Sequence, residues 1–109
     1  MTKYRTHTCN ELNIKNEGEK VLLSGWVNKK RDHGNLLFID LRDNYGITQC
    51  VIDKKNELFI KIEKIPLETV TQFEGQVVKR DKTTINKELN TGEIEIKIIN
   101  FKILGTTKE

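Results

Sequence analysis

One aromatic residue with charged neighbours is the clearest chemical signal in this sequence. Strand alternation in the run LLFIDLRD puts the aliphatic side chains on one face and Phe38, Asp40 and Arg42 on the other. Proteins that bind single-stranded nucleic acids stack bases on such exposed rings, at about 1 to 3 kcal/mol per base. The alternative is structural: Phe38 packs beneath the expected amino-terminal helix or a loop, because rings on such faces are often covered.

Basic residues come just before this strand. Lys29, Lys30 and Arg31 end the preceding β-like run and would hold phosphates or a base edge. The alternative is a solvated strand end, which is the commoner fate of a charge run. Arg80 is included among the candidate RNA contacts as one of only four arginines, each of which carries a guanidinium fork.

Two further polar residues could read bases. Gln49 carries two donors and an acceptor and could bind a Watson–Crick edge, although a single Gln on a strand is usually a surface residue. Glu95 lies on the polar face of the last expected strand and could accept from the exocyclic amine and ring N–H of a guanine. Its alternative is an ordinary strand carboxylate.

Catalytic and metal-binding patterns are absent from the sequence. His7 and His33 are not spaced with cysteines or carboxylates as metal ligands, so we expect no metal site. The sequence has no glycine-rich phosphate loop, GxSxG, HExxH or paired catalytic carboxylates. Cys9 and Cys50 are too far apart for a CxxC motif, and we expect reduced thiols in a cytoplasm. The residues therefore indicate a nucleic-acid-binding domain without catalytic machinery.

The elements that must position these residues are mainly strands. Thr8 and Glu11 have capping-box spacing, which predicts a short helix at about 8–14. Apolar residues at helical spacing predict an amphipathic helix within 54–64, which Pro66 ends. The expected strands cover residues 20–29, 36–43, 47–53, 69–80 and 93–104, with turns at 31–35 and 44–46 and a long polar loop at 81–92.

This order is helix, three strands, helix, two strands. It is the layout of an all-β, five-stranded Greek-key barrel, the OB-fold. Gly25 and Gly75, in the first and fourth strands, are expected to mark the bulges or bends that a small barrel needs.

Length and composition agree with one soluble domain. The chain has 109 residues, which suit one domain of residues 1–104, and we expect the polar GTTKE end, 105–109, to begin a linker. The 36 % hydrophobic and 32 % charged content argues against a disordered or membrane protein, and no apolar run of about 18 residues is present. The net charge of +3 implies no partner by itself.

Several motifs in order resemble the amino-terminal anticodon-binding domain of bacterial aspartyl-tRNA synthetases. They are RTHTCNEL (5–12), SGWVN (24–28), RDHGNLLFIDLRD (31–43), GITQ (46–49) and TGEIEI (91–96), and they span nearly the whole chain. The departures are mild: Lys29 and Lys30 stand where the family often has Arg, and Asn35 stands where it often has Gly.

The resemblance implies that the domain binds the anticodon loop of tRNA(Asp). By this analogy Phe38 stacks on the middle base, a uracil, and Gln49 binds its edge, while Glu95 reads the first base, a guanine, and Arg31 contacts the third. The parent enzyme would be a class II aspartate–tRNA ligase, a homodimer that uses ATP and Mg²⁺. Its catalytic core and cofactors are not expected within these 109 residues.

Two positions bear on tRNA specificity, because tRNA(Asp) and tRNA(Asn) differ at the third anticodon base. Family members that charge both tRNAs often have a His where His33 stands, and Thr84 replaces the Asn common in strict members. We therefore expect a non-discriminating enzyme, although His33 could simply be a turn residue. The competing hypotheses are a free-standing single-strand-binding OB protein and the OB domain of a lysyl- or asparaginyl-tRNA synthetase, against which the RTHTC start and TGEIEI end argue.

Overall fold

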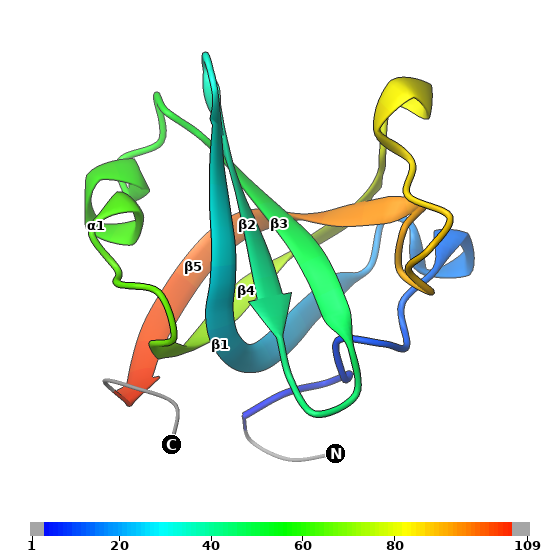
Figure 1. Cartoon of the computed structure of the whole chain (residues 1–109), viewed down its shortest axis with the longest axis horizontal. Coiled ribbons are helices and arrows are strands. Elements are labelled where there is room, and N and C mark those ends of the chain that lie inside the picture. The colour runs from blue at the N-terminus through cyan, green and yellow to red at the C-terminus, as the bar shows by residue number, and fades with distance from the viewer. Residues whose placement is uncertain (1–3, 106–109) are drawn as a thin grey trace.

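Five strands close into a barrel in the computed structural model, which describes residues 4–105 (Figure 1). Around the barrel the strands follow the order β1-β2-β3-β5-β4. All neighbouring strands are antiparallel except β3 and β5, which are parallel. The elements are η1 (Ile14–Asn16), β1 (Lys20–His33), β2 (Leu36–Arg42), β3 (Ile47–Asp53), α1 (Phe59–Glu63), β4 (Val70–Lys79), η2 (Lys82–Thr84) and β5 (Ile94–Gly105). The expected all-β, five-stranded OB-fold is confirmed.

The barrel closes because β1 bends and belongs to both halves of the sheet (Figure 1). Its first half, to Trp26, pairs with β4, and its second half, from Trp26, pairs with β2. The register shifts between Val27 and Lys29. At Gly25 an added Cβ would lie 2.3 Å from the carbonyl oxygen of Arg42, so the close approach of β1 to β2 requires a glycine there.

A second bend lies in β4, where the register against β5 shifts between Glu74 and Gly75. An added Cβ at Gly75 would lie 2.4 Å from Cγ2 of Ile96 and 2.5 Å from the carbonyl oxygen of Lys97. The bend expected at this glycine is therefore present, and the missing side chain lets the two strands approach each other.

The interior is aliphatic, with one phenylalanine. Alternation along the strands brings the side chains of one face together, and Phe73 is the largest fully buried residue. Cys9 and Cys50 are unpaired thiols within this core. Burial raises the pKa of both thiols, which keeps them protonated and unreactive.

The prediction of a helix at about 8–14 is wrong. The Thr8 amide donates to Oε1 of Glu11 at 2.6 Å, but residues 9–13 form turns and irregular backbone rather than a helix. Instead the backbone bonds to the barrel: the Cys9 amide donates to Oδ2 of Asp43 at 2.8 Å, and its carbonyl accepts from Oγ1 of Thr48 at 3.0 Å. These tertiary bonds replace the internal ones that a helix would make. The reciprocal capping box forms later, where Asn13 opens η1.

Two other expected boundaries differ from the structure. The helix predicted within 54–64 is confined to α1, because Asp53 and Asn56 accept the amides of residues two positions ahead, and such turns compete with a helix. The turn predicted at 31–35 shrinks because β1 continues to His33, leaving Gly34 with φ 63° at the hairpin tip.

β5 ends at Gly105, and the rest of the linker predicted at 105–109 lies outside the described residues. Within residues 4–105, no helix is long and apolar enough to cross a bilayer.

The close approach at Gly75 predicts a cost for any side chain there. We expect Gly75→Ala to lower the free energy of unfolding by about 1 to 3 kcal/mol, because the new methyl group overlaps both Ile96 and the β5 backbone. Gly105→Ala is the matched control, since its added Cβ would have its nearest neighbour at 3.8 Å. Chemical denaturation of both variants measures the difference. Equal stabilities would contradict the steric argument.

Candidate nucleic-acid interface

Four polar side chains form a row across the outer face of the barrel, one from each of four adjacent strands. They are Arg31 of β1, Asp40 of β2, Gln49 of β3 and Glu95 of β5. Strand register aligns three of them: Asp40 pairs directly with Gln49, and Cys50 pairs with Ile96, which places Gln49 beside Glu95. Arg31 is opposite Phe38 in register and reaches Asp40 diagonally with its side chain. We call these four residues the polar row.

Hydrogen bonds connect the polar row from end to end. Nη1 and Nη2 of Arg31 donate to the two carboxylate oxygens of Asp40 at 2.8 and 2.9 Å, which is a bidentate pair. Nη2 of Arg31 also donates to Oε1 of Gln49 at 2.7 Å, and Nε2 of Gln49 donates to Oε1 of Glu95 at 2.8 Å. The bonds to Asp40 raise the pKa of Arg31, so its positive charge is secure.

Gln49 is the residue that this row fixes most completely. Its side chain is engaged at both ends, by a donor on the oxygen side and an acceptor on the nitrogen side, and the residue is only 6 % exposed. Its amide therefore has one orientation, in contrast to the freely turning surface Gln of the alternative interpretation.

Phe38 stands next to the polar row and lines a cavity of about 370 Å³. It is half-buried and lies outside the hydrophobic core cluster, opposite Arg31 on β1 and Val51 on β3. The ring of His33 meets it edge-on, with the centroids 5.3 Å apart and the planes at 88°. The cavity is lined by Arg31, His33, Phe38, Asp40, Gln49, Arg80, Thr84, Asn86 and Leu89.

Arg80 holds the loop that forms the far wall of this cavity. It is 5 % exposed, and its Nε donates to the carbonyl of Ile94 while Nη1 donates to the carbonyl of Thr84, both at 2.9 Å. Burial lowers its pKa. Nη2 has no hydrogen-bond partner within residues 4–105. Because Arg80 donates hydrogen bonds to the carbonyl of Thr84 in η2 and to that of Ile94 in β5, it holds η2 and the following loop against β5.

The basic run of residues 29–31 does not gather at the cavity. Lys30 points toward α1, where its Nζ donates to the carbonyl of Glu63 at 2.7 Å, and burial lowers its pKa. Lys29 is exposed and pairs with Asp40 in register, but it does not line the cavity. Only Arg31 of the three reaches the cavity, so the structure does not assemble the basic rim expected there.

Three residues of the cavity were not among the predicted site residues. They are Asn86, Leu89 and Asp40, whose carboxylate binds Arg31. Alternation already placed Asp40 on the face of Phe38, so its sequence signal was available. The loop residues gave no such signal, because their position depends on how Arg80 folds the loop back. Within the described part of the chain, no three His, Cys, Asp or Glu side chains cluster in a way that could hold a metal ion.

The family follows from the sequence match. The tRNA anti-codon model, described as an OB-fold nucleic acid binding domain, matches residues 21–104, which include the whole polar row and Phe38. The chain belongs to this family. The cavity beside Phe38 is thus on the outer sheet face of an OB-fold nucleic-acid-binding domain.

Curated relatives of this OB-fold domain are much longer proteins. The chain is 65 % identical over 109 residues to an aspartate–tRNA(Asp/Asn) ligase of Pelagibacter ubique, covering all of this chain and 18 % of the relative. It is 52 % identical over 103 residues to the protein of the same name from Paramagnetospirillum magneticum, covering 94 % of this chain and 12 % of the relative. The chain therefore spans less than a fifth of the length of these relatives.

Solved structures share the fold. An asparaginyl-tRNA synthetase from Pyrococcus horikoshii superposes with a TM-score of 0.76 at 27 % identity, over 94 % of this chain and 23 % of that one. An OBody bound to hen egg-white lysozyme superposes with a TM-score of 0.81 at 20 % identity, over 97 % of this chain and all of that one. The second likeness concerns the fold alone.

The bidentate geometry predicts that Arg31 and Asp40 are energetically coupled. A double-mutant cycle with Arg31→Ala and Asp40→Ala should give a coupling free energy of about 1 kcal/mol, because the pair is bidentate and half-buried. The more exposed pair of Asp32 and Lys54 is the matched control, and its coupling should be about half as large or less. Both coupling free energies are measured by chemical denaturation, and equal values for the two pairs would contradict a stronger bidentate interaction.

Proposed function

We propose that this OB-fold domain binds the anticodon loop of tRNA(Asp) and tRNA(Asn) and serves a longer aspartate–tRNA ligase. The observation that carries the proposal is the placement of Phe38 with Arg31, Asp40 and Gln49 of the polar row in the lining of one cavity, with Glu95 hydrogen-bonded to Gln49 just outside that lining. An aromatic platform beside fixed donors and acceptors suits unstacked bases, which RNA-binding domains stack and read by their edges. The names and high identity of the curated relatives support the same assignment.

Each site residue has a role in this proposal. Phe38 stacks on the middle anticodon base, a uracil, and Gln49 binds its edge, with an amide held in one orientation by its neighbours. Glu95 accepts from the guanine at the first position, and Arg31 contacts the third base. Arg31 and Glu95 flank Gln49 in the polar row. Three successive bases can therefore contact Glu95, Gln49 and Arg31 in that order.

The dual specificity rests on His33 and Thr84, which line the cavity from opposite walls. The third anticodon base is C in tRNA(Asp) and U in tRNA(Asn), and in this proposal it enters the same cavity, which Arg31, His33 and Thr84 all line. Neither carries a negative charge or a fixed amide that would select one pyrimidine. Acceptance of both bases agrees with the Asp/Asn designation of the relatives.

The catalytic activity belongs to the rest of the proposed enzyme. Aspartate activation with ATP and Mg²⁺, a homodimeric state and a cytoplasmic location are further parts of this proposal, and their support is the resemblance to aspartate–tRNA ligases. The contribution of the described domain is to hold the anticodon loop.

Binding of anticodon stem-loops tests the proposal. Stem-loops carrying GUC and GUU should bind the chain with affinities within about threefold of each other, since discrimination of one good base contact is worth about 1 to 3 kcal/mol and none is expected. Replacement of the middle uracil should weaken binding by about tenfold or more. Binding that ignores the middle base would instead indicate a general single-strand-binding protein, and preference for GUC alone would contradict dual specificity.

Phe38 should be needed for binding and not for folding. We expect Phe38→Ala to weaken stem-loop binding by about 1 to 3 kcal/mol, because the stacking surface is lost. Its free energy of unfolding should fall much less than for a core phenylalanine, because Phe38 is half-buried and outside the core cluster. Phe38→Tyr is the control, since it keeps a ring. Unfolding of Phe38→Ala would show that the ring is structural.

A further inference from the structure

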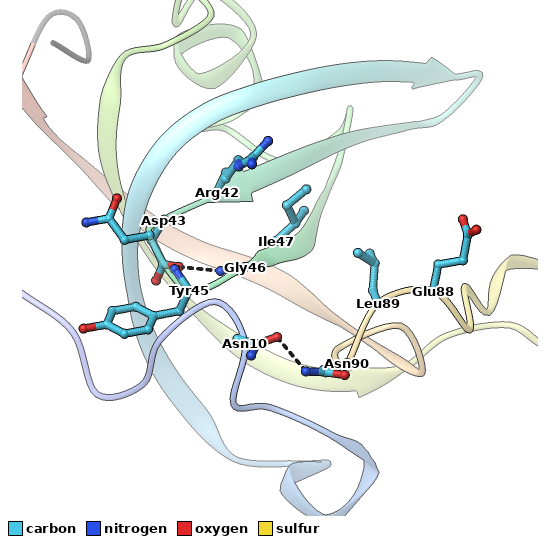
Figure 2. Close-up of a pocket in the computed structure, with 10 residues that line it drawn as sticks. Asn10, Arg42, Asp43, Tyr45, Gly46, Ile47, Glu88, Leu89 and Asn90 are labelled. Carbon is cyan, nitrogen blue, oxygen red and sulfur yellow. Dashed lines mark hydrogen bonds between the residues drawn. The ribbon is translucent and has the colours of Figure 1, made fainter.

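A second cavity lies beside the first, on the same face of the barrel. It measures about 310 Å³ and is formed between the β2–β3 turn and the loop after η2. Leu89 lines both cavities, so they are adjacent. Figure 2 shows Arg42 on β2 and Ile47 on β3 at one side, and Glu88, Leu89 and Asn90 on the facing loop.

Arg42 is the distinctive residue of this second cavity. It lies on the same face of β2 as Phe38 and Asp40, about 13 Å along the strand from Phe38 at 3.3 Å per residue. Each of the three other arginines contacts a carboxylate or backbone carbonyl groups. Arg42 is exposed, and within residues 4–105 its side chain makes neither a hydrogen bond nor an ion pair.

The carboxylates near Arg42 leave it available to an anion. Oδ1 of Asp43 accepts the amides of Tyr45 and Gly46 at 2.8 and 3.0 Å, and Oδ2 accepts the amide of Cys9. Oδ2 also lies 4.0 Å from Nη1 of Arg5, so the carboxylate of Asp43 is engaged by the turn, by Cys9 and by Arg5 rather than by Arg42. The amide side chains of Asn10 and Asn90 meet across the floor at 3.0 Å and tie the loop to the amino-terminal segment (Figure 2). Two exposed carboxylates remain near Arg42: Glu88 on the facing loop, and Glu68, which lines a neighbouring cavity together with Arg42. Within the described residues neither forms an ion pair with Arg42.

We propose that this second cavity binds a backbone phosphate of the RNA, through Arg42, at a nucleotide flanking the three that the polar row reads. The inference rests on the proposed function and extends its site. A guanidinium without an internal partner, set on the same face as the stacking ring, suits a phosphate, and phosphate contacts fix the position of an RNA whose bases are read elsewhere. An RNA strand leaving the first cavity past Leu89 enters the second without crossing the barrel.

Charge variants in the chain test this phosphate contact. We expect Arg42→Gln to weaken binding of the GUC stem-loop about three- to tenfold, with a salt slope smaller by about 0.7 to 1. Glu88→Gln should strengthen binding, because a carboxylate facing the same phosphate repels it. Lys61→Gln on α1 removes the same charge from an exposed residue outside both cavities and should change binding less. A loss for Arg42→Gln no larger than for Lys61→Gln would overturn the proposal.

Replacing single RNA phosphates by uncharged methylphosphonates locates the phosphate that Arg42 contacts. Methylphosphonate at one loop phosphate outside the three anticodon nucleotides should weaken binding to the unchanged chain and have no further effect on Arg42→Gln. Additive losses at every flanking position would overturn the second subsite. This outcome is distinguishable from failure of the proposed function, because the unchanged chain would still lose affinity when the middle uracil is replaced.

Discussion

The buried amide of Gln49 is the constraint on which the candidate site depends. An amide at 6 % exposure must find protein partners for its oxygen and nitrogen, because burying unpaired polar groups is costly. Arg31 and Glu95 are those partners, and Asp40 in turn holds the guanidinium of Arg31 with two hydrogen bonds. Moving any one of the four side chains would therefore change what the others can offer to a base.

The fold creates this constraint by closing the sheet. Arg31, Asp40 and Gln49 come together on the consecutive antiparallel strands β1, β2 and β3, whereas Glu95 joins them from 46 residues away because β5 pairs with β3. The closure depends on the bend of β1, where Gly25 allows the backbone to approach Arg42, and on the bend of β4 at Gly75. The strand ends and loops then border the row: the His33 hairpin on one side, and on the other the loop that Arg80 fastens to β5.

Much of the strand pattern could be predicted from the sequence, because alternation is a local property. It separated Phe38 from the core residues of its strand, and the boundaries of the third strand, 47–53, agree with β3. The prediction of an amino-terminal helix was wrong because the backbone of Cys9 is hydrogen-bonded to the side chains of Asp43 and Thr48. A capping-box pattern does not reveal these partners. The burial of Gln49 and the turning away of Lys30 likewise depend on residues from other strands and from α1. Nonlocal pairing, rather than local propensity, decided each of these.

We infer that the outer face carrying Phe38 and the polar row is the surface that holds the anticodon loop. An NMR titration of the isotope-labelled chain with a GUC anticodon stem-loop tests it most directly. We expect the largest chemical-shift changes at the side-chain amide of Gln49, the guanidinium of Arg31 and the backbone amides of β2 and β3 around Phe38. Changes confined to α1 and the carboxyl-terminal half of β5, with those signals unmoved, would contradict it.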